Sequence, residues 1–290
     1  MLNEGQFSQL VTAIKQKREL QKINEDFVRD ELLFFFQREK KVQEQLEKKF
    51  NPKSADFRQV VKEVRSKLRR VYSLFRIDEK EKNRQQLVKL LLKEKEVNPE
   101  LLKKILETNA STKERIPFYA TLYQKLFKIT GEPKLILDLG CGINPFSVYF
   151  TGLKELEYLA YDLNEEEIGF LNRFFRFLTK TWPGFKGKAE VLNLRQFSKL
   201  KKIKNADVCF LFKFTDVLDR GKGHKVSEEV ITAIPAKNII VSFPTKTMSG
   251  KEMSFPERKW IELMCKRLGY GLQAVKFNNE IFYVLRKRNI

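Results

Sequence analysis

The sequence predicts an α/β domain built on a mostly parallel sheet, preceded by a helical N-terminal domain. Residues 1–107 are rich in helix-forming residues and contain no glycine after Gly5, whereas the rest of the chain alternates apolar strand segments with helix segments. A tight Gly-Cys-Gly turn follows the first apolar strand segment, as in nucleotide-binding sheets. The length of 290 residues suits two domains, because single hydrophobic cores stop growing at roughly 250 residues.

The N-terminal part is expected to be a small helix bundle. Asn51-Pro52 and Asn98-Pro99 are its clearest breaks, because proline is tolerated at a helix start and disfavours helix in the residue before it. Both before the first break and between the two breaks, apolar residues recur at the spacing of an amphipathic helix. The stretches that show this spacing are 27–36, 60–71 and 87–91.

Beyond residue 108, seven segments have the composition of β-strands. The first five are almost continuously apolar and are separated by helix segments, which is typical of a parallel sheet covered on both faces. Asn278-Asn279 separates the last two segments and favours a closing antiparallel hairpin. This is the arrangement of the seven-stranded, Rossmann-like methyltransferase fold, so the predicted domains are 1–107 and 108–290. The predicted strand segments are 134–140, 156–163, 189–194, 207–212, 237–243, 272–277 and 281–287.

The turn after the first strand, in the segment LDLGCGINPF, is the most informative part of the chain. Gly140 and Gly142 remove side chains where the backbone must fold sharply and approach a ligand, and Asp138 stands at the strand end. The third glycine of the dinucleotide fingerprint is missing, and Asn144-Pro145 stands there instead. This turn therefore favours the sulfonium cofactor S-adenosylmethionine over a dinucleotide.

The following strands supply further candidates for cofactor binding. Asp162 comes 24 residues after Asp138, at the end of the second strand, where such sheets place an acid that binds ribose hydroxyls. Asn193 and Leu194 end the third strand and are expected beside the adenine, with Asp207 opening the fourth strand. These last three placements depend on the order of the strands.

Charge is the unusual feature of the composition. The chain carries 57 Lys and Arg against 37 Asp and Glu, a net charge of +20 and an isoelectric point of about 9.7. The excess is +8 over residues 1–107 and +12 over 108–290, so it is not confined to a tail. Such a balance favours a polyanionic partner, with nucleic acid as the leading candidate and a surface kept charged for solubility as the alternative.

Other classes of protein are disfavoured by what the sequence lacks. No apolar run approaches the roughly 18 residues that a membrane span needs. Cys141, Cys209 and Cys265 are far apart and form no CxxC pair, which supports neither a metal site nor a disulfide framework. We therefore expect a cytoplasmic protein without a metal.

The absence of two methyltransferase motifs narrows the chemistry. Lys213, Phe214 and Thr215 follow the fourth strand, where enzymes that methylate exocyclic amines carry an Asp-Pro-Pro-Tyr motif. No Pro-Cys nucleophile for covalent activation of a pyrimidine is present either. Attack by a ring nitrogen with a free lone pair remains, such as guanine N7, which needs no general base. The only histidine, His224, is accordingly expected in a loop or at a partner contact.

Four segments, in order, carry a resemblance to one family. The segment VSFPTKTMSGKEM, residues 241–253, resembles the SFP-(Arg/Lys)-S-L-x-G-(Arg/Lys) stretch of the 16S rRNA guanine-N7 methyltransferases that confer aminoglycoside resistance, the Arm/Rmt/Fmr family. STKERIPFY, LDLGCGINPF and DVCFLFKFTDVLDR resemble the stretch before the first strand, the cofactor loop and the fourth strand of the same family. The chain is thus identified as a distant member.

The resemblance implies a reaction, a partner and the roles of several residues. It implies methyl transfer to guanine N7 of 16S rRNA, near the decoding site, with the helical domain docking on the small ribosomal subunit. Arg115 would bind the carboxylate of the cofactor. Arg220, Lys246 and Lys251 would contact the target nucleotide and its flanking phosphates. Met253 would press against a base rotated out of its helix.

Two other functions stay open at this point. One is methylation of another RNA or another ring nitrogen, such as adenine N1. The other is a non-catalytic module that binds the cofactor or the ribosome during assembly. The segment Gly250-Lys251-Glu252-Met253 is shorter and less basic than the family loop.

We expect the protein to act as a monomer.

Overall fold

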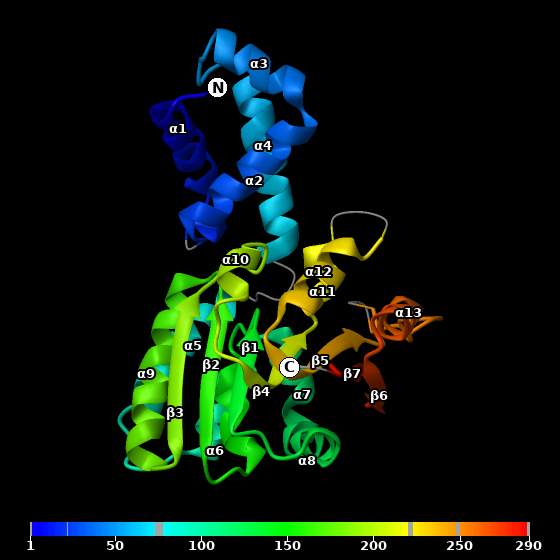
Figure 1. Cartoon of the computed structure of the whole chain (residues 1–290). Helices are drawn as coiled ribbons and strands as arrows, with labels where there is room; N and C mark the ends of the chain where they lie inside the picture. The colour runs from blue at the N-terminus through cyan, green and yellow to red at the C-terminus, as the bar shows by residue number, and fades with distance from the viewer. Residues whose placement is uncertain (1, 22, 73–77, 220–222, 248–249, 289–290) are drawn as a thin grey trace. The chain divides into compact units, whose positions relative to one another are not determined.

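The structure is a computed structural model that describes the chain except for residues 1, 22, 73–77, 220–222, 248–249 and 289–290. Its contacts divide the chain into two compact units (Figure 1). The first comprises Met1–Arg76 with Leu163–Glu166, and the second comprises Ile77–Asp162 with Glu167–Ile290. No described helix is both long enough and apolar enough to cross a membrane.

The first unit is a bundle of helices with its own core, which confirms the predicted helical character. Asn3 begins the first helix through a capping box with Gln6, and the predicted break at Asn51-Pro52 separates the last two helices. Their apolar sides, including Phe35 and Val64, form one buried cluster. The elements are α1 (Glu4–Lys15), η1 (Arg18–Leu20), α2 (Glu25–Arg38), α3 (Lys40–Lys48) and α4 (Ala55–Tyr72).

The compact units divide at residues 76 and 77, whereas the sequence predicted domains that divide at residue 107, and the predicted domains stay a prediction. The helices α5 (Asp78–Leu91) and α6 (Pro99–Leu106) belong to the second unit, where their apolar residues share a core with the sheet. Arg84 anchors α5 there, because its guanidinium binds Glu167 at 2.6 Å and Thr108 at 2.7 Å in a buried position. Helical spacing in the sequence shows that a helix forms, but it does not show which core the helix covers.

The second unit contains a seven-stranded sheet in the order β3-β2-β1-β4-β5-β7-β6. The first five strands are parallel, whereas β7 runs antiparallel to both β5 and β6. The predicted fold class and its terminal hairpin are therefore confirmed. The strands are β1 (Leu135–Leu139), β2 (Leu156–Asp162), β3 (Phe185–Val191), β4 (Ala206–Phe212), β5 (Ala236–Pro244), β6 (Gly271–Lys276) and β7 (Glu280–Arg286).

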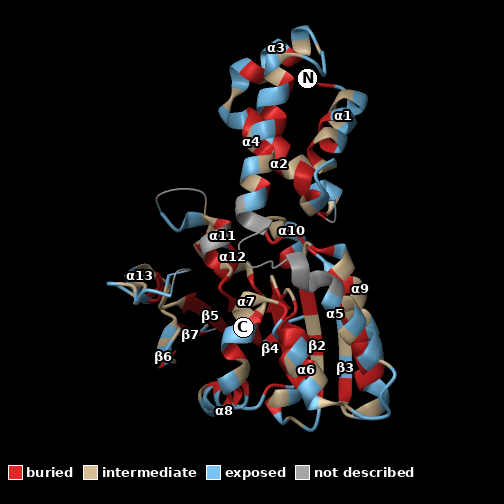
Figure 2. Cartoon of the chain, turned by 180° about the vertical axis from the view of Figure 1, so that it is seen from behind, coloured by how far each residue is buried: buried red, intermediate tan, exposed pale blue. Residues whose placement is uncertain are grey.

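Helices cover both faces of this sheet, and each face has a separate core (Figure 2). Alternate strand residues point to opposite faces, so Ile136 packs with α5, α6, α8 and α9, while Leu137 packs with α10, α12 and α13. The remaining elements are α7 (Ala110–Arg115), η2 (Ile116–Phe118), α8 (Tyr119–Thr130), η3 (Asn144–Thr151), α9 (Glu165–Thr181), α10 (Phe197–Leu200), α11 (Thr215–Leu218), α12 (Lys225–Ala233) and α13 (Lys259–Leu268).

Candidate functional site

The turn between β1 and η3, residues 140–144, lies at the carboxyl edge of the parallel strands, and we call it the glycine turn. Gly140 has a φ of 64°, and its N–H donates to the carbonyl of Tyr161 at 2.8 Å, which ties the turn to the end of β2. A Cβ at Gly140 would lie 2.3 Å from the ring of Phe214. The turn therefore requires glycine here for both conformation and space.

Gly142 meets a different environment on the same turn. Its φ is 49°, and a Cβ added here would meet no atom within 4 Å. Its N–H donates to the carboxylate of Asp162 at 2.8 Å. The turn and the acid at the end of β2 thus lie side by side, with open space in front of Gly142, and their predicted contact with a cofactor stays a proposal.

Asp138 lies behind the turn and is 1% exposed. Its Oδ2 accepts hydrogen bonds from Asn144 Nδ2 at 2.9 Å and from the Tyr158 hydroxyl at 2.6 Å. Burial outweighs these bonds and raises the pKa of Asp138 to about 6. Tyr119 donates to the Asn144 Oδ1 at 3.0 Å, so the start of η3 is held from two sides. In this arrangement Asp138 fixes the shape of the turn, and its predicted contact with the cofactor stays a proposal.

Arg115 is fully buried at the end of α7 and is already paired. Its Nε and Nη2 donate to the two oxygens of Glu280 at 2.9 and 2.7 Å, and its guanidinium lies 4.8 Å from the ring centre of Phe212. A cofactor carboxylate would have to share this guanidinium with Glu280. Binding of that carboxylate by Arg115 therefore stays a proposal.

Glu280 is the centre of a buried charged cluster that the sequence did not reveal. It starts β7, is 0% exposed, and accepts a hydrogen bond from the Ser242 hydroxyl on β5. Lys213 Nζ lies 3.5 Å from its Oε2 and also donates to Glu114. Lys213 has a φ of 51°, unusual for a residue with a side chain, at the end of β4. Arg115, Lys213 and Glu280 therefore join α7, β4 and β7 beside the edge where the glycine turn lies.

Asn193 and Leu194 follow β3 at this same edge, although the strand ends at Val191, earlier than predicted. Both are buried, and the Asn193 Oδ1 accepts from the N–H of Arg195 at 3.1 Å. Their position is compatible with the predicted place beside an adenine, which stays a proposal.

The structure does not place Asp207 where the sequence analysis expected it. This residue lies near the start of β4, at the opposite edge of the sheet, and its carboxylate accepts from the N–H groups of Lys134 and Leu135 at 2.8 and 2.9 Å. The prediction counted an acid at the beginning of the fourth strand, whereas parallel strands bring their carboxyl ends to a nucleotide. Asp207 therefore holds the start of β1 rather than a cofactor.

The loop between β5 and α13, residues 245–258, brings three predicted target-contacting residues together. Lys246 forms an antiparallel bridge with Glu252, and the N–H of Met253 donates to the carbonyl of Thr245 at 2.9 Å. Lys251 is exposed. The loop thus leaves the carboxyl end of β5 and returns to it. Arg220, the fourth predicted contact, lies outside the described residues.

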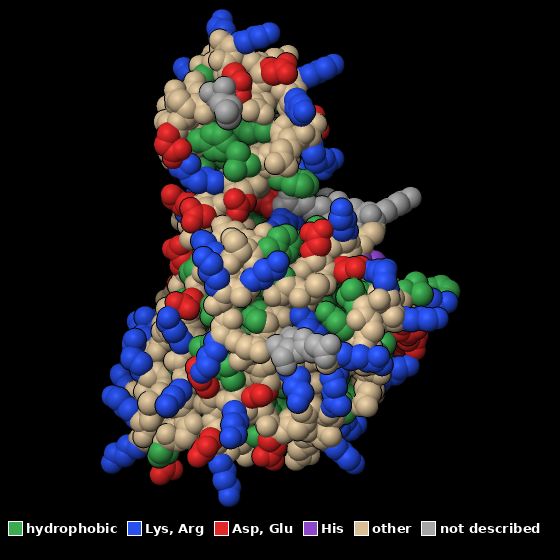
Figure 3. Space-filling view, in the orientation of Figure 1, with side chains coloured by type: hydrophobic (Ala, Val, Ile, Leu, Met, Phe, Trp, Pro, Cys, Tyr) green, Lys and Arg blue, Asp and Glu red, His purple; other side chains and the backbone are tan. Residues whose placement is uncertain are grey.

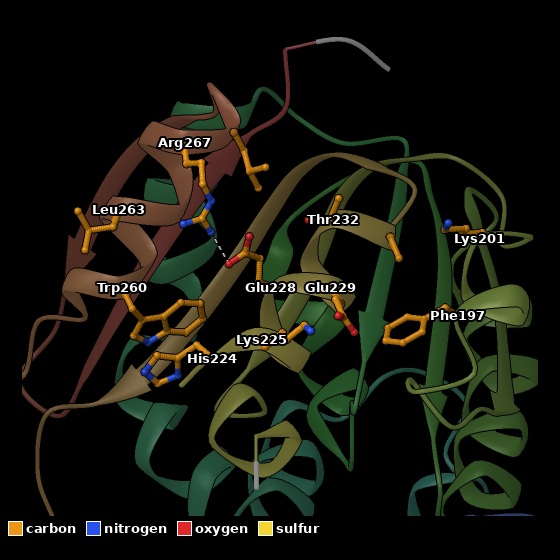
Figure 4. A pocket seen from close by; sticks show the side chains of 12 residues that line it. Phe197, Lys201, His224, Lys225, Glu228, Glu229, Thr232, Trp260, Leu263 and Arg267 are labelled. Carbon is orange, nitrogen blue, oxygen red and sulfur yellow. Dashed lines mark ion pairs between the residues drawn. The ribbon is translucent and has the colours of Figure 1, made fainter. Parts of the chain in front are cut away.

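His224 is the residue that precedes α12. Its ring stacks on Trp260, with centroids 4.3 Å apart, and its Nδ1 is 3.5 Å from Asp219 Oδ2. Figure 4 shows both rings at one end of a groove of about 870 Å³ lined by α10, α12 and α13. His224 thus contacts Trp260 and Asp219, and its predicted role outside catalysis stays a prediction.

Sequence reasoning missed the residues that hold the site in place. Tyr158 lies within one apolar strand segment and Glu280 precedes another, so neither stands out in the sequence from ordinary strand residues. The one signal was an acid immediately before five apolar strand residues, where a charge needs a buried partner. Phe214 carried no signal, because nothing in the sequence shows that its ring covers Gly140.

Comparison with known proteins decides the family. Residues 38–284 match the family described as "Ribosomal RNA methyltransferase (FmrO)". The chain belongs to this family of ribosomal RNA methyltransferases. The resemblance predicted from the four sequence segments is therefore confirmed, together with the enzyme class, an S-adenosylmethionine-dependent RNA methyltransferase.

Individual relatives agree with this membership. The chain is 28% identical over 267 residues to a 16S rRNA (guanine(1405)-N(7))-methyltransferase of Proteus mirabilis. The aligned part covers 86% of this chain and 89% of the relative. The chain is similar in fold to the 16S rRNA methyltransferase RmtF, solved with S-adenosyl-L-homocysteine, at a TM-score of 0.75, 19% identity and coverage of 99% and 100%. The 16S rRNA methylase ArmA gives a TM-score of 0.54 at 27% identity, over 71% of this chain and 98% of that one.

Proposed function

We propose that this methyltransferase modifies N7 of a guanine in 16S rRNA, near the decoding site of the small ribosomal subunit, and that it acts as a monomer. One observation carries the proposal: the glycine turn with Asp162 and the basic β5–α13 loop start at the same edge of one sheet. A bound donor and a target nucleotide can therefore meet there. Relatives that act on this guanine in 16S rRNA match most of the chain.

The residues at the glycine turn fit S-adenosylmethionine. Gly142 leaves open space, and Asp162 presents a carboxylate that accepts hydrogen bonds from ribose hydroxyls. Asn193 and Leu194 lie after the neighbouring strand, where an adenine would be held. When bound, S-adenosylmethionine supplies an electrophilic methyl carbon on a sulfonium.

The protein's own contribution is positioning rather than proton transfer. Guanine N7 carries a free lone pair at neutral pH, so its alkylation needs no general base. The Arg115–Glu280–Lys213 cluster holds the ends of β4 and β7, and Asp138 holds the glycine turn, so the walls of the site are fixed before substrate arrives. Lys246 and Lys251 would hold the target nucleotide and its phosphates, and Met253 would contact the extruded base.

Charge supports an rRNA partner. The net charge is +20, and Figure 3 shows Lys and Arg side chains spread over the visible surface of the second unit. The helical first unit carries part of this excess, and we propose that it docks on the subunit. Contacts to phosphate predict that binding weakens as salt rises.

The test is methylation of purified small subunits with labelled S-adenosylmethionine, followed by reductive cleavage and primer extension to locate the base. Label at a single guanine of 16S rRNA is expected. Asp162→Ala should abolish donor binding in calorimetry, whereas Glu157→Ala, at the opposite end of the same strand and paired with Lys204 at 2.5 Å, should not. Label in tRNA alone, or on adenine, would contradict the proposed target. Subunit binding without any methylated product would indicate the non-catalytic alternative.

A further inference from the structure

Phe255 is the most exposed large apolar side chain among the described residues. It is 84% exposed, against 63% for Leu263, the next in order. Single exposed apolar residues are common, so exposure alone does not make a contact site. What distinguishes Phe255 is its place in the β5–α13 loop, two residues after Met253, which returns to the sheet edge through its hydrogen bond to Thr245.

The backbone at Phe255 is also held by Arg258, which follows it in the same loop. Arg258 Nη1 donates to the carbonyl oxygens of Phe255 and Pro256 at 3.2 and 3.1 Å. The same guanidinium lies 5.0 Å from the ring centre of Phe243 on β5, and the N–H of Arg258 donates to the Tyr283 hydroxyl on β7 at 2.9 Å. The ring is therefore presented to solvent by a backbone that is tied to two strands of the sheet.

Three lysines lie near Phe255 in the chain, together with the acidic Glu252 and Glu257. Lys246 and Lys251 precede it in the same loop, and Lys259 opens α13 just after it. Figure 3 shows hydrophobic, basic and acidic side chains interspersed over the part of the second unit that carries α13. An exposed aromatic ring among cations is the combination that binds unpaired nucleic acid, because the cations meet phosphates while the ring stacks on a base.

The chemistry of the proposed function creates a place for such a ring. A guanine that is rotated out of a helix leaves a gap in the base stack, and enzymes that extrude bases commonly insert an apolar side chain at the unstacked step. We propose that Phe255 stacks on the rRNA base next to the target guanine and fills this gap. The proposal rests on the proposed function and adds to it the side chain that stabilises the extruded state.

The test compares four variants of the full chain with small ribosomal subunits. Phe255→Ala should lower kcat/KM for the subunit about tenfold or more, whereas Phe255→Trp should keep at least half of the wild-type value, because stacking on a base is worth about five- to 150-fold in binding. Phe255→Leu should resemble the alanine variant, since it keeps apolar volume but loses the flat ring. Leu263→Ala is the matched control, an exposed apolar residue on α13 that should leave activity unchanged.

A second readout separates stacking from a structural role. The indole of Phe255→Trp should be quenched when small subunits are added, beyond any change in wild type from Trp182 and Trp260, and donor affinity should stay at the wild-type value in every variant. Full activity in the alanine or leucine variant, or no quenching, would overturn the proposal. If the wild-type protein modified no base of the subunit, the proposed function would be wrong. The quenching measurement would then still show whether the side chain at position 255 contacts the subunit.

Discussion

The glycine turn and the β5–α13 loop start at the same edge of the sheet but are held in opposite ways. Buried groups fix the turn: Asp138 binds Asn144 and Tyr158, and Gly142 binds Asp162. The β5–α13 loop instead presents exposed Lys251 and Phe255 on a short backbone bridge. Under the proposed function, the site for the small donor is prepared inside the protein, whereas the large substrate would be recognised by exposed side chains whose partners lie on the substrate.

The buried side of this comparison predicts the largest effect on stability. Arg115→Ala should lower the free energy of unfolding by about 4 kcal/mol, because it leaves Glu280 buried without its bidentate partner. Urea denaturation followed by tryptophan fluorescence measures this, since Trp182 and Trp260 both lie in the second unit. Arg267→Ala removes an exposed pair with Glu228 and should cost less than about 1 kcal/mol. Equal losses of unfolding free energy in the two variants would contradict the prediction that the buried pair contributes more to stability than the exposed pair.

Two glycines of the same turn sharpen the comparison. Gly140→Ala should cost about 3 kcal/mol, because it adds a Cβ in a left-handed conformation and drives it against Phe214. Gly142→Ala has the same conformational cost without the clash and should cost about 1 kcal/mol. Thermal unfolding of both variants, and of Gly140→Ala combined with Phe214→Ala, measures the difference. If Phe214→Ala restored none of the stability lost in Gly140→Ala, the clash with the Phe214 ring would not be the cause of that loss.

Asp138 predicts a dependence on pH. Burial raises its pKa from 3.8 to about 6, so the folded state favours the protonated form. The stabilisation from this group is fully present below pH 3.8 and is lost as the pH rises to about 6, a difference of about 3 kcal/mol. Asp138→Asn does not ionise, so its stability relative to wild type should increase by about this amount between pH 3.8 and pH 7. Denaturation curves at a series of pH values measure it, and a constant difference would contradict the prediction.

The exposed loop predicts the smallest effect on stability. Lys251→Ala should change the free energy of unfolding by less than about 0.5 kcal/mol and leave donor affinity unchanged, because its side chain is in solvent. It should lower kcat/KM for small subunits about tenfold through a lost phosphate contact. Lys154→Ala, an exposed lysine at the opposite edge of the sheet, is the control. Weaker donor binding in the Lys251 variant would show that the two regions are not separate.

Much of the fold could be predicted because it depends on local patterns. The continuous apolar runs predicted the parallel strands, Asn278-Asn279 predicted the hairpin, and Gly140 and Gly142 predicted the sharp turn. The unit boundary could not be predicted, because the faces of α5 and α6 look the same whether they cover a sheet or a bundle. Asp207 was misplaced for a related reason, since an acid at either end of a strand has the same local sequence.

The sequence by itself determined the parallel strands with their terminal hairpin, the glycine turn followed by the acid at Asp162, the charge that favours nucleic acid, and the family. These follow from short-range patterns and from composition. Only the tertiary structure decided that Arg115 meets Glu280, that Phe214 covers Gly140, and that Phe255 is held open to solvent by Arg258. Such pairs lie far apart in the chain or depend on which side of the backbone a ring occupies, and packing of the whole sheet fixes them.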